Sequence, residues 1–141
     1  MSEPSILIVD DDVNTRELLR EILERRGYKS ITCENGEQAL SELEHIPAPS
    51  VILLDLDMPV MNGYEFRVAQ RERVEISSVP VVVMSAGRQI DRVTLGDVEY
   101  LPKPFTTEAL LKRIRGASEQ RLRSSPLVSR ETADPFGAGS A

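Results

Sequence analysis

Short apolar segments alternate with segments of helical spacing along most of the chain, and this alternation limits the folds open to it. An uninterrupted apolar run is typical of a strand buried on both faces. Strands separated by amphipathic helices form a parallel sheet that the helices cover on both sides. We therefore expect an α/β fold with a doubly wound, five-stranded parallel sheet. The predicted strands are residues 5–9, 30–33, 51–55, 79–84 and 98–101.

The segments between these strands predict helices of unequal length. Leu18, Leu19, Ile22 and Leu23 recur at helical spacing before Gly27, a residue suited to a helix end. Residues 88–96 contain few apolar side chains, so any helix there should be short. A second predicted helix starts after an Asn35 cap, ends before Pro47, and carries Ala39, Leu40, Leu43 and Ile46 on one face. A third spans residues 66–74. The last starts after Thr106 or Thr107 and carries Leu110, Leu111, Ile114 and Ala117.

Polar residues follow several of the predicted strands at the point where each strand ends. They are Asp10 and Asp11, Asp55, Ser85, and Lys103. Right-handed crossovers place the carboxyl ends of parallel strands at one edge of the sheet, where ligands bind in folds of this class. Pro59 and the turn residues that follow it take the chain out of the sheet soon after Asp55. Asp55 is therefore the candidate nucleophile, placed where solvent can reach it.

Carboxylates gathered at one edge repel each other. Each pair at about 4 Å costs roughly 4 kcal/mol at an effective dielectric constant near 20, so the cluster needs protons or a cation. A small set of oxygen ligands with room for water favours Mg²⁺. With Asp10, Asp11, Asp55 and Lys103 all charged, the sum is −2, which one Mg²⁺ neutralises. A phosphate group could then dock beside the metal and Lys103.

Length and charge set the remaining limits. The 141 residues favour one domain, which we place at residues 1–123, with residues 124–141 as a flexible tail or truncated linker. The net charge of −6 argues against nonspecific binding to nucleic acid or to anionic membranes. No apolar run approaches the length of a membrane span, and the single cysteine gives no indication of an oxidising compartment. We expect a cytoplasmic protein without membrane insertion.

Together, these motifs resemble the receiver domain of two-component response regulators. The resemblance covers roughly residues 5–120 and uses every expected position in order. It implies the flavodoxin-like strand order 2-1-3-4-5, with the fourth helix here short or absent. The motifs that carry it are ILIVDDD (6–12), LDLDMPVMNG (54–63), MSA (84–86) and LPKPF (101–105).

The resemblance implies that Asp55 accepts a phosphoryl group from a phosphohistidine. The donor would be a sensor histidine kinase or a histidine phosphotransfer protein. Asp11 and Asp55 would bind Mg²⁺ through their carboxylates, Asp57 through its backbone carbonyl, and Asp10 mainly through water. Such a domain catalyses its own phosphorylation and dephosphorylation, although its main role is signalling to a downstream protein partner without direct contact with nucleic acid.

The resemblance also implies how the signal leaves the site. Ser85 would hydrogen-bond the phosphoryl group, and Lys103 would pair with it after a cis peptide bond to Pro104. Tyr100 would turn inward as Ser85 moves and so remodel the face formed by the fourth helix, fifth strand and fifth helix. The segment between Ser85 and Tyr100 is shorter than usual in this family, so this switch is less well supported than the phosphorylation site.

Simpler interpretations exist for each residue on its own. Acids in the run 10–12 could cap a helix, Lys103 could be a solvated turn residue, Ser85 could be a helix cap, and Tyr100 could serve only to pack the core.

Two other functions also fit parts of the pattern. One is a degenerate receiver that binds a partner regardless of phosphate. The other is a hydrolase of the haloacid dehalogenase type, although that family places its Asp-x-Asp pair after the first strand.

Overall fold

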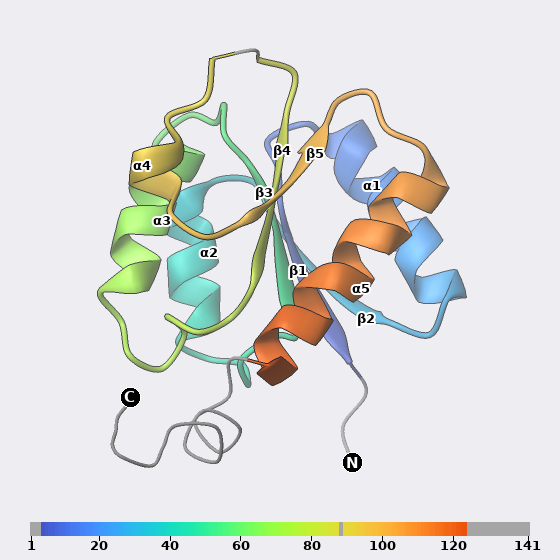
Figure 1. The fold of residues 1–141 in the computed structure, drawn as a ribbon, viewed down its shortest axis with the longest axis horizontal. Helices are drawn as coiled ribbons and strands as arrows, with labels where there is room; N and C mark the ends of the chain where they lie inside the picture. The colour runs from blue at the N-terminus through green and yellow to red at the C-terminus, as the bar shows by residue number, and fades with distance from the viewer. Residues whose placement is uncertain (1–3, 88, 124–141) are drawn as a thin grey trace.

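A parallel sheet forms the centre of the molecule (Figure 1). The computed structural model describes residues 4–87 and 89–123, with side chains described up to residue 119. Within this part, five parallel strands are ordered β2-β1-β3-β4-β5, which confirms the predicted fold and strand order. The strands are β1 (Ser5–Val9), β2 (Lys29–Cys33), β3 (Val51–Asp55), β4 (Val81–Ser85) and β5 (Glu99–Pro102).

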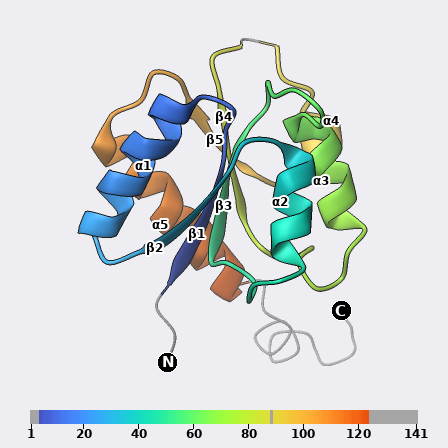
Figure 2. The same cartoon turned by 180° about the vertical axis from the view of Figure 1, so that it is seen from behind.

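Helices cover both faces of this sheet. The helices α1 and α5 lie on one face, and α2 and α3 lie on the other, with α4 beside α3 (Figures 1 and 2). The sheet is therefore doubly wound, as expected from the alternation of strands and helices. The helices are α1 (Val13–Arg25), α2 (Gly36–Leu43), α3 (Gly63–Arg71), α4 (Arg92–Leu95) and α5 (Thr107–Arg123).

The core consists of two apolar clusters, one on each side of the sheet. Successive residues of β3 alternate between them: Leu53 packs in the cluster under α1 and α5, and Leu54 packs in the cluster under α2 and α3. Both side chains are fully buried. Alternation along a strand sends neighbouring side chains to opposite faces, so a strand covered on both sides has no polar face. This is why the run of residues 51–54 is apolar throughout.

The start of α3 differs from the prediction of a helix over residues 66–74. Asn62 accepts a hydrogen bond from the Glu65 N–H at 2.9 Å, and the Glu65 side chain accepts one from the Asn62 N–H at 2.9 Å. This capping box begins the helix at Gly63, three residues earlier than expected. A Cβ atom on Gly63 would lie 2.6 Å from the Asp55 carbonyl oxygen, so only glycine allows α3 to begin this close to β3.

Other boundaries also needed correction. The helix α2 ends at Leu43, so Ile46 packs against the core from the following turn and Pro47 does not terminate the helix. On α1, Leu19 and Leu23 are buried, whereas Leu18 is 58% exposed and faces away from the core. The predicted strand over residues 79–84 begins at Val81, after Pro80, which has no N–H to donate to a ladder.

The short fourth helix is confirmed, because α4 has four residues. Gly27 has φ of +90° and follows the end of α1, as its predicted role requires. The predicted tail, residues 124–141, lies outside the described residues. Across the described ranges, no helix is both long enough and apolar enough to cross a membrane.

Candidate functional site

The candidate acids meet at the carboxyl edge of the sheet. Asp10 follows β1 and is fully buried, Asp11 comes next and is exposed, and Asp55 is the last residue of β3 and is 5% exposed. One carboxylate oxygen from each of Asp10, Asp11 and Asp55 lies within 4.8 Å of the others. The parallel topology therefore brings together acids that are far apart in the sequence, as predicted.

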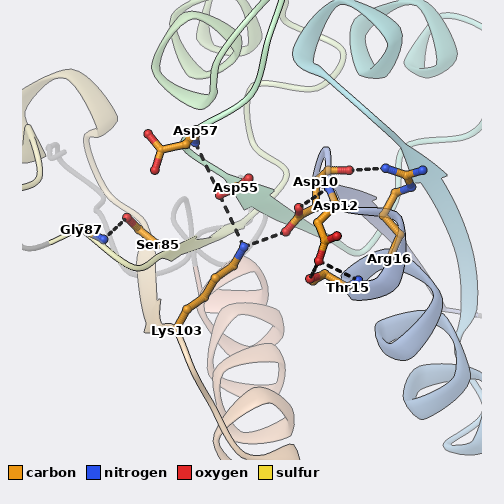
Figure 3. A network of polar contacts seen from close by, with 9 residues as sticks. All are labelled: Asp10, Asp12, Thr15, Arg16, Asp55, Asp57, Ser85, Gly87 and Lys103. Atoms are coloured by element: carbon orange, nitrogen blue, oxygen red, sulfur yellow. Dashed lines mark hydrogen bonds and ion pairs between the residues drawn. The ribbon is translucent and has the colours of Figure 1, made fainter.

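Lys103 reaches this cluster from the segment after β5. Its Nζ lies 2.9 Å from Asp10 Oδ2 and 3.6 Å from Asp55 Oδ1, so the ammonium group lies between two carboxylates (Figure 3). The Lys103 N–H donates to the Ser85 carbonyl at 2.9 Å, and the Lys103–Pro104 peptide bond is cis, as the resemblance implied. Lys103 is therefore not a free turn lysine.

Asp10 is fixed from several sides. Its Oδ1 accepts a hydrogen bond from the Asp12 N–H at 2.9 Å, and its backbone carbonyl accepts one from Arg16 Nη1 at 2.7 Å. Asp12 has a different task, because its side chain accepts from the Thr15 N–H and caps α1 (Figure 3). The acidic run thus combines both interpretations: Asp10 and Asp11 belong to the cluster, and Asp12 is a helix cap.

The cluster changes the proton affinity of its members. Burial, together with the charge of Asp10, raises the pKa of Asp55 to about 6, although Lys103 acts in the opposite direction. Burial alone would lower the pKa of Lys103, but its hydrogen bond to Asp10 and the charges of Asp10 and Asp55 outweigh that effect and raise it. The site therefore contains Lys103 as a stable cation, and Asp55 as a carboxylate with too few hydrogen-bond donors and cations near it to offset its burial.

Asp57 and Ser85 flank Asp55. The Asp57 N–H lies 3.4 Å from Asp55 Oδ1, a long contact, while the Asp57 side chain is exposed. Ser85 ends β4, is 7% exposed, and its Oγ accepts a hydrogen bond from the Gly87 N–H at 3.0 Å. Ser85 therefore closes a short turn in this structure, and its hydroxyl lies on the same sheet edge as Asp55 (Figure 3).

A hollow of about 390 Å³ opens beside the acids. Asp11 and Asp57 contribute its charged wall, and Tyr64 from the first turn of α3 contributes an aromatic wall. The donors available here are carboxylate and carbonyl oxygens, which suit a small hard cation that keeps part of its water shell. The arrangement therefore fits Mg²⁺. The lining residues are Asp11, Leu56, Asp57, Met58, Pro59, Asn62 and Tyr64.

Tyr100 lies apart from the acids. It is half-buried on β5, and the guanidinium carbon of Arg92 lies 4.1 Å from the centre of its ring. The distance is within the range of a cation–π contact. Tyr100 is thus covered by the first residue of α4 in this structure.

Comparison with known proteins identifies the family. A family model described as response regulator receiver domain matches residues 6–115. The chain belongs to the response regulator receiver family. The match extends from β1 into α5, so the receiver domain includes every element that contributes to the acidic cluster.

Curated relatives of this receiver domain are longer proteins. This chain is 40% identical over 128 residues to the Transcriptional regulatory protein CpxR homolog of Haemophilus influenzae. The match covers 88% of this chain and 54% of the relative. It is 41% identical over 114 residues to Transcriptional regulatory protein CpxR of Escherichia coli K12, covering 78% of this chain and 47% of the relative. The chain spans about half the length of these relatives.

Solved structures show the same fold. The chemotaxis protein CheY4 of Vibrio cholerae is 28% identical and superimposes with a TM-score of 0.76, covering 82% of this chain and 99% of that one. The shared fold agrees with the sheet order and helix placement seen here.

Sequence reasoning did not identify two buried polar residues on α3. Arg67 is 6% exposed and Gln70 is fully buried. Arg67 Nε donates to the Leu95 carbonyl at 2.6 Å, and Gln70 Nε2 donates to the Ile76 carbonyl at 2.9 Å. Arg67 and Gln70 share the helical spacing of the buried Phe66, but their polar side chains favour solvent, so spacing alone does not predict their burial.

Proposed function

We propose that this receiver domain accepts a phosphoryl group on Asp55 and passes the signal on through a conformational change. The observation that carries the proposal is the cluster of Asp10, Asp11 and Asp55 carboxylates within 4.8 Å of one another, with the Lys103 ammonium group between Asp10 and Asp55. A site for a neutral ligand does not require several charged side chains in contact. Phosphoryl transfer requires positive charge beside the accepting carboxylate, because the incoming group is itself anionic.

In the proposed reaction, a carboxylate oxygen of Asp55 attacks the phosphorus of a phosphohistidine. The new O–P bond forms as the N–P bond breaks, and the imidazole leaves with the bonding electron pair and takes a proton from water. The product is an acyl phosphate on Asp55, a common form of covalent catalysis by carboxylates. The proposed donors are a sensor histidine kinase or a histidine phosphotransfer protein.

Each neighbouring residue has a proposed part in this reaction. Asp11 and Asp55 would hold Mg²⁺ through carboxylates, Asp57 through its backbone carbonyl, and Asp10 mainly through water. When bound, the metal supplies positive charge that lets an anionic phosphoryl group approach the acids. Lys103 pairs with the phosphoryl oxygens.

The Ser85 hydroxyl donates to the phosphoryl oxygens once its turn with Gly87 opens. The downstream partner is proposed to be a protein, and the proposed compartment is the cytoplasm. Two further parts remain proposals: the Tyr100 switch, and the extent of the domain at residues 1–123.

The competing interpretations have less support. A degenerate receiver would tolerate loss of the acids, the lysine or the hydroxyl, whereas all of these are present and the acids and lysine are in contact. A haloacid dehalogenase fold does not agree with the family match or with the position of Asp55 on the third strand.

Phosphorylation is tested with Mg²⁺ and a small phosphodonor such as acetyl phosphate, followed by intact mass. We expect one acid-stable, base-labile phosphoryl group on the wild type and none on Asp55→Asn. Asp57→Asn is the matched control, because it makes the same chemical change nearby but keeps the backbone carbonyl, so labelling should persist. Labelling of Asp55→Asn, or its complete loss in Asp57→Asn, would contradict the proposed roles.

A further inference from the structure

Tyr64 contacts two regions that the proposed reaction must connect. Tyr64 lines the hollow together with Asp11 and Asp57. Its hydroxyl oxygen accepts a hydrogen bond from the Asp91 N–H at 3.1 Å. Asp91 is the N-cap of α4, and its side chain accepts from the Thr94 N–H at 3.0 Å. One residue therefore borders the hollow and contacts the start of α4.

The helix α4 is too short to hold its own position, and α3 supplies the contacts that fix it. Arg67 Nε donates to the Leu95 carbonyl at 2.6 Å, and Arg71 Nη1 donates to the Thr94 carbonyl at 3.3 Å. These bonds satisfy carbonyls that a four-residue helix leaves unpaired at its end. The start of α4 is tied to α3 by Tyr64, and its end by the two arginines.

The helix α3 is in turn fixed against the strand that carries the proposed acceptor. The Gly63 N–H donates to the Leu56 carbonyl at 3.0 Å, and the absence of a Cβ on Gly63 lets α3 approach the end of β3. Tyr64 is the next residue, so its ring has little freedom to follow a movement of β4. Two contacts lie on the other side of Tyr64: the Gly87 N–H donates to Ser85 Oγ, and the Asp91 N–H donates to the Tyr64 hydroxyl.

We propose that Tyr64 is a positioning residue that couples occupation of the hollow to the release of α4, an inference that rests on the proposed phosphorylation of Asp55. A phosphoryl group on Asp55 draws Ser85 toward it and opens the turn with Gly87. Asp91 then moves away from α3, while Tyr64 stays with α3. The Tyr64–Asp91 hydrogen bond breaks, and the N-terminus of α4 becomes free to rearrange, together with Arg92, which covers Tyr100.

The test measures amide hydrogen exchange of residues 89–97 with and without beryllofluoride and Mg²⁺, used as a phosphoryl mimic. Loss of one neutral hydrogen bond corresponds to about a fivefold change in a local opening equilibrium. In the wild type, the mimic should raise exchange at these residues by about that factor. In Tyr64→Phe, which keeps the ring, exchange should already be raised without the mimic, and the mimic should add no further increase.

Two control variants separate coupling from simple loosening. Tyr28→Phe makes the same chemical change at a half-buried tyrosine in the cluster under α1 and α5, and it should behave as the wild type. Arg71→Met loosens the other end of α4 without touching the hollow. It should raise exchange in both states and keep the response to the mimic.

The outcomes distinguish the two proposals. If fluorine NMR shows beryllofluoride bound to the wild type but exchange at residues 89–97 does not change, Tyr64 is not a coupling residue and the proposed phosphorylation stands. The same conclusion follows if Tyr64→Phe keeps the full response. If beryllofluoride does not bind and acetyl phosphate does not label the wild type, the proposed function fails and the coupling fails with it.

Discussion

Lys103 has unequal contacts with the two carboxylates that it joins. Asp10 accepts from the ammonium group at 2.9 Å and from the Asp12 N–H as well. Asp55 lies 3.6 Å from the ammonium group, and among the described residues the one hydrogen bond to its side chain is the long contact with the Asp57 N–H. Asp10 is thus well paired, and Asp55 retains oxygen lone pairs without close donors. A carboxylate in that condition is the one most ready to bind a cation, a proton or a phosphoryl group.

The poor pairing of Asp55 predicts a pH-dependent cost to stability. Burial and Asp10 raise its pKa from an ordinary value of 3.8 to about 6, so the folded protein binds a proton more tightly than the unfolded chain does. Stability contributed by this proton is present below about pH 4 and is lost as pH rises through about 6. In EDTA, Asp55→Asn should raise the free energy of unfolding by up to about 3 kcal/mol at about pH 8.

Urea denaturation near pH 8 and near pH 4 checks this expectation. The gain from Asp55→Asn should be much smaller at the lower pH, because the wild-type carboxyl is then neutral in both states. An equal gain at both values would show that the effect comes from packing instead of charge.

Val60 has a backbone conformation that its side chain disfavours. Its φ is +68°, its side chain is 72% exposed, and the Met61 N–H donates to the Pro59 carbonyl at 2.7 Å across it. A β-branched residue at positive φ is strained by about 1–3 kcal/mol, which exceeds the entropic cost of glycine. Val60→Gly should therefore stabilise the fold by about 0.5–1 kcal/mol in thermal or urea unfolding.

Val74→Gly is the comparison for this variant. Val74 is 82% exposed, in a turn whose φ is not positive, so glycine there should only add freedom to the unfolded chain and lower the stability slightly. A loss of stability in both variants would argue against strain at Val60.

At the scale of elements, α3 does more than cover the sheet. Its inward side carries Arg67, whose guanidinium donates to the Leu95 and Asp97 carbonyls and to Gln70 Oε1. These contacts replace the internal hydrogen bonds that a longer fourth helix would have. A short α4 is therefore compatible with a well-formed fold because α3 provides the missing donors.

Removing the Arg67 donors should destabilise the protein strongly. Arg67→Met keeps an apolar stem but leaves buried acceptors without that partner, at a cost of about 1–3 kcal/mol. Arg71→Met removes one exposed bond of 3.3 Å and should cost about 0.5 kcal/mol or less. Urea denaturation of both variants checks the difference, and equal losses would show that Arg67 contributes no more than a surface residue.

Some elements could be predicted from sequence because their determinants are local. Asn35 and Thr106 accept the hydrogen bonds expected of caps, from the Gln38 and Ala109 N–H groups. The helix α3 begins earlier than the sequence predicts, because Asn62, a residue type typical of turns, caps the helix together with Glu65. The inward position of Arg67 could not be predicted, since its backbone acceptors, the Leu95 and Asp97 carbonyls, lie 28 or more residues away in the sequence.

At the scale of the whole molecule, one sheet separates two cores, and β3 belongs to both. Leu53 and Leu54 are adjacent in sequence and fully buried, but they contact different helices. A substitution that destabilises either core should therefore destabilise the entire domain, because the central strands are packed into both cores.

Leu53→Ala and Leu54→Ala test this cooperativity. Each should cost about 3–5 kcal/mol, a large part of the stability of a domain of this size. Fluorescence and circular dichroism transitions in urea should coincide in both variants, with the slope of the wild type. Separate transitions for the two probes would show that the two cores unfold independently.

The site follows from the same topology. Asp11, Asp55 and Lys103 could be placed together from sequence, because parallel strands end at one edge and the apolar runs marked those ends. The contacts of Tyr64 and Arg92 could not, because they depend on how α4 lies beside α3 and β5. The sequence therefore predicted which groups meet, but not the side chains that link the site to its surroundings.

The ion pair between Lys103 and Asp10 joins residues 93 positions apart. A chain interrupted before residue 103 would contain Asp10, Asp11 and Asp55 and lack the cation that lies between Asp10 and Asp55. The complete site would then form only with the last strand in place, so a labelled molecule would be one whose sheet has all five strands paired.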